Sequence, residues 1–187
     1  GRTAVAAAFD DELARVAAGA ADSAAEVEIV PAALGVLPAV TQARLRAHGV
    51  AAVVRPALAR LLDAAQAQGV QRVVVHALTD GRDSRPDSAL PAIRALEARG
   101  AVVGTVVGRY WAMDRDHRWD RTQRAYDAMV HGHGEHADRA SDAVQRSYDA
   151  GVSDEFIEPW VIGDPAANRI RPGDAVIVWN FRPDRAI

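Results

Sequence analysis

The feature that most constrains the fold is a series of short β-branched runs, beginning near residue 70 and separated by helical segments. Residues 72–78 (RVVVHAL) and 101–107 (AVVGTVV) are continuous apolar runs, as in strands that are buried on both faces of a sheet. Residues 175–179 (AVIVW) predict a third strand, after a turn at residues 171–174. Strands that alternate with helices predict an α/β fold: a three-layer open sheet, mostly parallel, with helices on both faces.

Helices are expected between these strands. A helix over residues 89–99 ends at Gly100, and one over residues 142–150 ends at Gly151. A longer helix is predicted over residues 116–130. Its inner face is assigned to Trp119, Ala125, Tyr126 and Met129.

The first third of the chain is more difficult to interpret. Residues 1–69 are alanine-rich and mostly helical in pattern, while residues 27–40 are apolar but broken by prolines and glycine, and allow at most a short strand. We therefore expect residues 1–187 to form a single domain, with a diverged helical part at residues 1–69 and a more regular part at residues 70–187.

Composition excludes several functions. The net charge of −3 argues against nucleic-acid binding, which usually needs a basic face. Apolar runs are too short to cross a bilayer and cysteine is absent, so we expect a soluble, cytoplasmic protein without membrane contact. All 22 basic residues are arginine, a bias that genome composition explains. Only the positions of the arginines therefore carry information.

Arginines follow each of the three predicted strands. The carboxyl ends of parallel strands form the crevice in which open α/β sheets bind ligands, so these side chains should converge. Guanidinium groups pair with phosphate and carboxylate oxygens, and a small phosphorylated acid is the expected occupant. The simpler alternative is that each arginine lies on the surface or pairs with the adjacent aspartate. The arginines of the three strand ends are Arg82, Arg109, Arg115, Arg182 and Arg185.

Aspartates accompany these arginines. Asp80, Asp83, Asp114 and Asp184 are candidates for fixing the guanidinium planes. Asp83 has a second possible role, which is to accept a hydrogen bond from a substrate hydroxyl group.

At these residues the chain resembles the cofactor-independent phosphoglycerate mutases. Residues 76–83 (HALTDGRD) resemble the family's H-x-x-x-D-G-R-D segment, and residues 108–119 resemble its GRYYAMDRDxRW segment. Residues 154–159 and 180–186 resemble its DEFxxP and NFRPDR segments, in the same order along the chain.

The resemblance implies a function. The family interconverts 3-phosphoglycerate and 2-phosphoglycerate in glycolysis, with a phosphatase-like domain that holds a nucleophilic serine and two manganese ions. An inserted transferase domain holds the glycerate, and this chain resembles that domain. The positions that match the family's substrate-binding residues are Arg82, Asp83, Arg109, Arg115, Arg182 and Arg185.

The sequence departs from the family in two places. The family's DGGVHSH segment, with a histidine that contacts substrate, has no counterpart before residue 70, and His48 is not assigned to this role. The phosphatase domain is also missing, so we expect no catalytic residue, no metal site and no turnover from this chain alone. The cluster at residues 131–136 (HGHGEH) has metal-binding residue types, but its glycines make it a poorly organised site.

Two hypotheses of different classes follow. The first is a transferase domain of a full mutase, whose partner is the missing phosphatase domain. The alternative is a free-standing, non-catalytic domain that binds small anions.

Overall fold

The computed structural model describes residues 27–31 and 70–179, together with the helical residues 58, 61–63, 65 and 67. The described strands form one six-stranded sheet in the order β4-β5-β3-β2-β1-β6. All neighbouring strands are parallel except β3 and β5, which are antiparallel. The strands are β1 (Val27–Pro31), β2 (Val73–Thr79), β3 (Val102–Gly108), β4 (Glu135–Ala137), β5 (Trp160–Ile162) and β6 (Ala175–Trp179).

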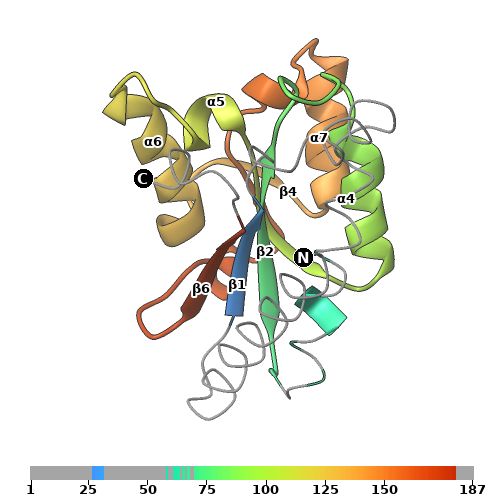
Figure 1. Ribbon diagram of the computed structural model, residues 1–187, viewed down its shortest axis with the longest axis vertical. Helices are drawn as coiled ribbons and strands as arrows, with labels where there is room; N and C mark the ends of the chain where they lie inside the picture. The colour runs from blue at the N-terminus through green and yellow to red at the C-terminus, as the bar shows by residue number, and fades with distance from the viewer. Residues whose placement is uncertain are drawn as a thin grey trace, which may run out of the picture.

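The helices cover both faces of this sheet, as Figure 1 shows. Helices α4 and α7 lie together on one face, and α5 and α6 lie on the other. The helical elements are α4 (Ala89–Ala98), α5 (Arg109–Ala112), α6 (Trp119–Tyr126), the π-helical turn η1 (Asp127–His131), α7 (Ala140–Asp149), the 3-10 turn η2 (Asp154–Phe156) and α8 (Pro165–Asn168). The predicted three-layer α/β fold with a mostly parallel sheet is confirmed.

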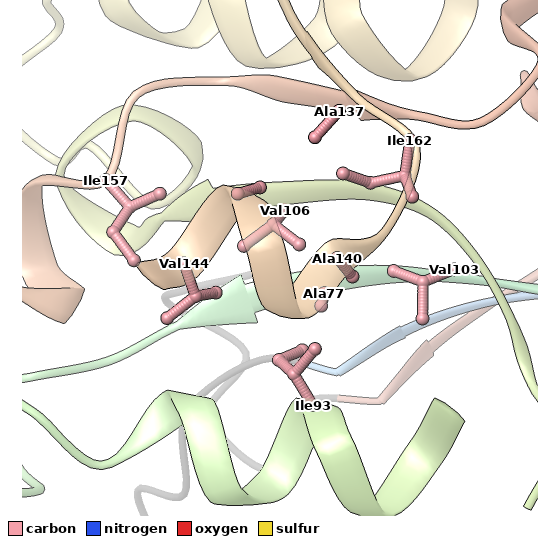
Figure 2. Close-up of a cluster of buried hydrophobic side chains, with 10 residues drawn as sticks. Ala77, Ile93, Val103, Val106, Ala137, Ala140, Val144, Ile157 and Ile162 are labelled. Atoms are coloured by element: carbon pink, nitrogen blue, oxygen red, sulfur yellow. The ribbon is translucent and has the colours of Figure 1, made fainter. Parts of the chain in front are cut away.

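The main core lies between the sheet and the pair α4 and α7 (Figure 2). Ile93 of α4 and Val144 of α7 pack with Val103 and Val106 of β3, and Ile157 closes the cluster near the carboxyl end of β3. Because β-branched side chains fill this layer from several strands and helices, the carboxyl ends of β2 and β3 are held in a fixed relation.

The inner face predicted for the helix at residues 116–130 is wrong in part. Ala125 is buried, but Trp119 is 70% exposed and Tyr126 is 51% exposed. The buried side runs from Ala125 of α6 to Ala128 of η1, which is also buried. Trp119 and Tyr126 are seven residues apart and share a different face, because seven residues are close to two helical turns.

The sheet also contains strands that the sequence pattern did not predict. β4 and β5 have three residues each, and β5 pairs in the opposite direction to β3. None of the helices in the described part of the chain is long and apolar enough to span a membrane.

The division into residues 1–69 and 70–187 stays a prediction, since most of the first segment lies outside the described residues. β1 confirms the short strand that was allowed within residues 27–40.

Candidate functional site

The carboxyl ends of β2 and β3 lie side by side, with Thr79 paired to Gly108. The β2–α4 loop (residues 80–88) leaves the first strand, and α5 begins directly after the second at Arg109. The two strand ends therefore place the Asp80–Asp83 segment beside Arg109, as the parallel-sheet argument predicts.

Of the three predicted arginines that the structure describes, Arg109 is the most deeply buried. Its side chain is only 3% exposed, and its Nη1 group donates to the carboxylates of both Asp80 and Asp83, the latter at 2.8 Å. Burial alone would lower the pKa of the guanidinium, but the hydrogen bonds and charges of Asp83 and Asp80 raise it above its usual value. Arg109 is therefore a fixed cation whose orientation two carboxylates set.

Two polar atoms of this cluster are buried without a hydrogen-bond partner among the described residues. They are Nη2 of Arg109 and Oδ2 of Asp80. A buried donor and a buried acceptor of this kind normally find a protein group, a water molecule or a ligand. The arrangement leaves one donor of the Arg109 guanidinium fork without a partner among the described residues.

Arg82 and Asp83 are more exposed than Arg109. The Arg82 side chain is 62% exposed, and its Nη1 lies 3.8 Å from a carboxylate oxygen of Glu155. Asp83 is 47% exposed and contacts Arg109. Arg82 and Arg109 thus lie beside three carboxylates, those of Asp80, Asp83 and Glu155.

The α5–α6 loop (residues 113–118) carries Arg115, which is exposed. Asp114 fixes this loop, because its carboxylate accepts from the backbone N–H groups of Asp116 at 3.0 Å and Arg118 at 2.8 Å. It also pairs with Arg121 at 3.0 Å. Burial alone would raise the pKa of Asp114, but these hydrogen bonds and the Arg121 charge lower it.

The predicted orienting role of the aspartates is therefore divided. Asp80 and Asp83 orient Arg109, whereas Asp114 orients Arg121 and the backbone of its own loop. Arg182, Arg185 and Asp184 lie outside the described residues, and their place in the site stays a prediction.

His76, which begins the HALTDGRD segment, has no part in this cluster. Its ring is fully buried and its Nδ1 lies 3.0 Å from Oγ1 of Thr105 on β3. This contact joins β2 to β3 and is structural.

An aromatic group borders the site. Tyr110 packs against Trp111 and Phe156, with ring centroids 5.0 and 5.2 Å apart. The indole N–H of Trp111 donates to the Phe156 carbonyl at 3.3 Å, and Arg124 lies over the Trp111 ring. Since Trp111 directly follows this edge of the sheet, it is a natural optical reporter of binding.

A segment that sequence reasoning gave no role, residues 154–157, lies across both strand ends. Gly108 donates its N–H to the Ile157 carbonyl at 2.7 Å, and Thr79 Oγ1 donates to the Asp154 carbonyl at 2.6 Å. A Cβ on Gly108 would come within 2.5 Å of the Glu155 carbonyl oxygen. The glycine is required here because two backbone segments meet.

Metal ligation has no obvious place in the described residues, since they contain no group of three or more His, Asp or Glu side chains suited to a metal ion. Within residues 131–136, the rings of His131 and His133 are 5.8 Å apart, and Glu135 and His136 are consecutive residues of β4. Consecutive strand residues point to opposite faces, so these two do not converge.

Comparison with known proteins gives a consistent result. Residues 48–187 match the family model described as "BPG-independent PGAM N-terminus". The chain is 49% identical over 135 residues to a 2,3-bisphosphoglycerate-independent phosphoglycerate mutase of Symbiobacterium thermophilum, and 51% identical over 138 residues to that of Thermomicrobium roseum. Each match covers 69% of this chain and 26% of the relative, so the chain spans about a quarter of these relatives' length.

A solved structure shares the fold. The chain superposes on Leishmania mexicana phosphoglycerate mutase, crystallised at low cobalt concentration, with a TM-score of 0.72 and 28% sequence identity. The similarity covers 91% of this chain and 32% of that one.

Proposed function

Because this chain belongs to the 2,3-bisphosphoglycerate-independent phosphoglycerate mutase family, we propose that it is the domain that holds phosphoglycerate during the interconversion of 3-phosphoglycerate and 2-phosphoglycerate. The observation that carries the proposal is the Arg109 guanidinium, buried at the carboxyl end of β3, fixed by Asp80 and Asp83 and retaining an unpartnered Nη2 group. A rigid guanidinium with a free donor suits a phosphate or carboxylate oxygen.

The other substrate contacts in this proposal come from the same edge of the sheet. Arg82 and Asp83 lie on the β2–α4 loop, and Arg115 lies on the α5–α6 loop. Arg182 and Arg185 follow β6 in the sequence. Since the acids beside Arg82 and Arg109 outnumber these two cations, we expect the later arginines to supply the positive charge that an anionic substrate needs.

Phosphoryl transfer itself belongs, in this proposal, to the part of the family that the chain does not span. That part would hold the nucleophilic serine and the metal ions, which the family resemblance gives as two manganese ions. The reaction would serve glycolysis in the cytoplasm. The role of this chain, in the same proposal, is to bind and orient the glycerate.

Titration with 3-phosphoglycerate tests the proposal, with tryptophan fluorescence as the signal. Trp119→Phe removes an exposed indole, so that Trp111 contributes more of the fluorescence change. We expect saturable binding, and Arg109→Ala should weaken it about 10- to 100-fold, because a charge-assisted hydrogen bond contributes about 1.5–3 kcal/mol.

Arg99→Ala is the matched control. Arg99 also pairs with an aspartate, Asp63, but it precedes β3 and lies at the opposite end of that strand. Its removal should leave the affinity unchanged. Equal affinities of wild type and Arg109→Ala would contradict the proposal, and equal binding of inorganic sulfate would favour a general anion-binding domain instead.

A further inference from the structure

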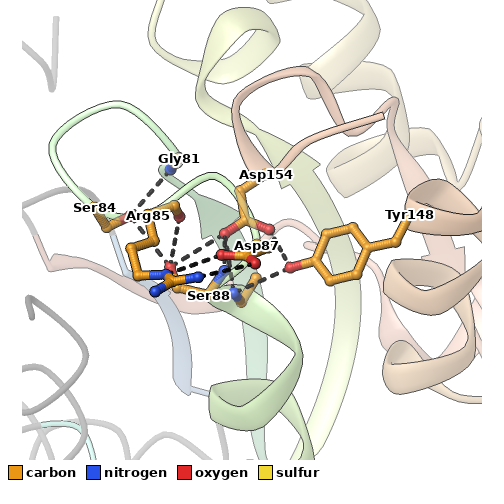
Figure 3. Close-up of polar contacts among 8 residues, drawn as sticks. Gly81, Ser84, Arg85, Asp87, Ser88, Tyr148 and Asp154 are labelled. Carbon is orange, nitrogen blue, oxygen red and sulfur yellow. Dashed lines mark hydrogen bonds and ion pairs between the residues drawn. The ribbon is translucent and has the colours of Figure 1, made fainter. Parts of the chain in front are cut away.

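The β2–α4 loop is held from outside by a buried carboxylate, that of Asp154. The side chain is 1% exposed and lies on η2, a segment 66 residues further along the chain than Ser88. Figure 3 shows it between the end of the loop and α7.

The hydrogen bonds of this carboxylate attach to the point where the loop ends and α4 begins. Oδ2 accepts from the backbone N–H groups of Ser88 at 2.8 Å and Ala89 at 2.9 Å, and from the Ser88 hydroxyl at 3.2 Å. These N–H groups are at the start of α4, where the helix has no partners of its own and where its dipole favours a negative charge. Ser88 makes no capping bond with its own side chain, so Asp154 supplies the cap.

A second element fixes the carboxylate. Oδ1 of Asp154 accepts a hydrogen bond from the Tyr148 hydroxyl, which itself accepts from the Ala89 N–H at 3.2 Å. Tyr148 belongs to α7, which is packed against α4 through the main core. Burial and the Asp154 carboxylate both raise the pKa of Tyr148, so the phenol stays protonated and keeps donating.

The same residue also contacts the start of the loop. The Asp154 carbonyl accepts from Thr79 Oγ1 at 2.6 Å, and its N–H donates to the Pro86 carbonyl at 2.8 Å. Gly81 lies against it so closely that a Cβ there would be 2.8 Å from Asp154 Cβ. Asp154 thus contacts Thr79, which precedes the 80–83 segment, and Pro86 and Ser88, which follow it.

The loop also has internal hydrogen bonds, among them the pair between Arg85 and Asp87. Gly81 donates its N–H to Ser84 Oγ at 3.1 Å, and the Ser88 hydroxyl donates to the Arg85 carbonyl at 2.9 Å. Neither bond connects the loop to the sheet. Its position relative to Arg109 is set at one end by the Asp80 and Asp83 contacts to that arginine and at the other end by Asp154.

From these contacts we infer that Asp154, held by Tyr148, is a positioning residue for substrate binding: it fixes the β2–α4 loop so that Arg82 and Asp83 meet the substrate beside Arg109. The inference concerns a residue that does not itself touch substrate. The expected effect of Asp154 on substrate affinity rests on the proposed function, whereas its expected effect on the order of the loop does not.

Two measurements on the same variants separate these parts. Hydrogen exchange of the amides of residues 81–89, without any ligand, reports whether the loop is anchored. Titration with 3-phosphoglycerate reports whether anchoring matters for binding. Asp154→Ala should accelerate exchange throughout the loop and weaken binding about tenfold, which corresponds to the loss of one charge-assisted contact.

Conservative variants distinguish positioning from general stability. Asp154→Asn keeps an oxygen for the Ser88 and Ala89 N–H groups and should restore most of the affinity. Tyr148→Phe should give an intermediate exchange rate. Val144→Ala, a fully buried position on α7 without contact to the loop's hydrogen bonds, should lower the melting temperature but leave affinity and loop exchange unchanged.

The outcomes are separable. Unchanged loop exchange in Asp154→Ala overturns the inference, as does faster exchange with unaltered affinity. If Asp154→Ala does not fold, Asp154→Asn and Tyr148→Phe decide by the same criteria. If the wild type fails to bind 3-phosphoglycerate, the proposed function fails, and loop exchange alone still tests whether Asp154 anchors the loop.

Discussion

The two loops that border the site are fixed in different ways. The α5–α6 loop is organised locally, by Asp114 bonding to N–H groups two and four residues ahead. The β2–α4 loop is organised from a distance, by Asp154 of η2 and Tyr148 of α7. The first loop therefore needs only its own sequence to form, whereas the second needs the packed fold.

The two anchoring carboxylates also differ electrostatically. Burial alone would raise the pKa of both acids. In Asp114 the loop N–H groups and Arg121 reverse this effect and lower the pKa. In Asp154 burial prevails over its hydrogen bonds and raises the pKa. The surroundings of Asp114, which include Arg121, thus favour its ionised form. The surroundings of Asp154 offer only neutral donors, and burial disfavours its ionised form.

The largest effect on stability is expected at Gly81, where η2 packs against the β2–α4 loop. Gly81 has a φ of 64°, and an added Cβ would lie 2.6 Å from the Glu155 nitrogen. Gly81→Ala combines left-handed strain with a backbone clash and should cost about 2–5 kcal/mol, measured by chemical denaturation.

Gly100→Ala is the control for this variant. Gly100 has a φ of 76° with open space around the Cβ position, so only the strain of about 1–2 kcal/mol applies. Equal costs at the two glycines would show that η2 does not press on the β2–α4 loop.

Removing the local anchor should cost somewhat less. Asp114→Ala leaves two backbone N–H groups and Arg121 without their acceptor, and we expect a loss of about 2 kcal/mol. Hydrogen exchange should accelerate at Asp116 and Arg118 but not at Ser88 or Ala89. Acceleration in both loops would mean that they are one cooperative unit, and the comparison would then fail.

Weakening the distant anchor without removing it should cost less again. Tyr148→Phe deletes one hydrogen bond to the buried Asp154 carboxylate, worth about 1.5 kcal/mol. Thermal unfolding should register this as a fall of about 3–6 °C in melting temperature for a domain of this size. No change would indicate that the Tyr148 contact does not hold the carboxylate.

The smallest effect is on pH dependence, and its sign differs for the two acids. The pKa of Asp114 is lowered in the folded state, so its contribution to stability is present above its unfolded pKa and is lost as pH falls through the folded pKa. The pKa of Asp154 is raised, so its contribution is present below the unfolded pKa and is lost as pH rises through the folded pKa.

Melting temperatures across the acid range therefore test this sign. Asp114→Asn should flatten the loss of stability at the most acidic pH. Asp154→Asn should remove the decline that begins as pH rises above the ordinary aspartate pKa near 3.8. Identical pH profiles of the two variants would contradict the assignment.

The same contrast explains what could be predicted from sequence. Continuous β-branched runs fixed β2 and β3, and the rule for parallel strand ends brought Asp80 and Asp83 to Arg109. Asp114 lies within four residues of the amides it bonds, so its loop is a local pattern. Asp154 bonds residues 65 and 66 positions away, and no periodicity encodes such a link.

Other errors have similar physical causes. β4 and β5 are too short to show a strand pattern, because three residues give barely one alternation. The prediction placed Trp119 and Tyr126 on the inner face because they are the largest apolar side chains of this helix. The buried positions are instead occupied by the small residues Ala125 and Ala128.

The most direct test of the account is an amide NMR map of this chain with and without 3-phosphoglycerate. We predict that the largest chemical-shift changes occur at Asp80–Asp83, on the β2–α4 loop, and at Gly108–Tyr110, at the end of β3 and the start of α5. A cavity of about 350 Å³ at the other end of β3, lined by Glu97, Val102 and Arg139, is the natural competitor. Shifts centred on that cavity, with the Arg109 region unchanged, would contradict the account.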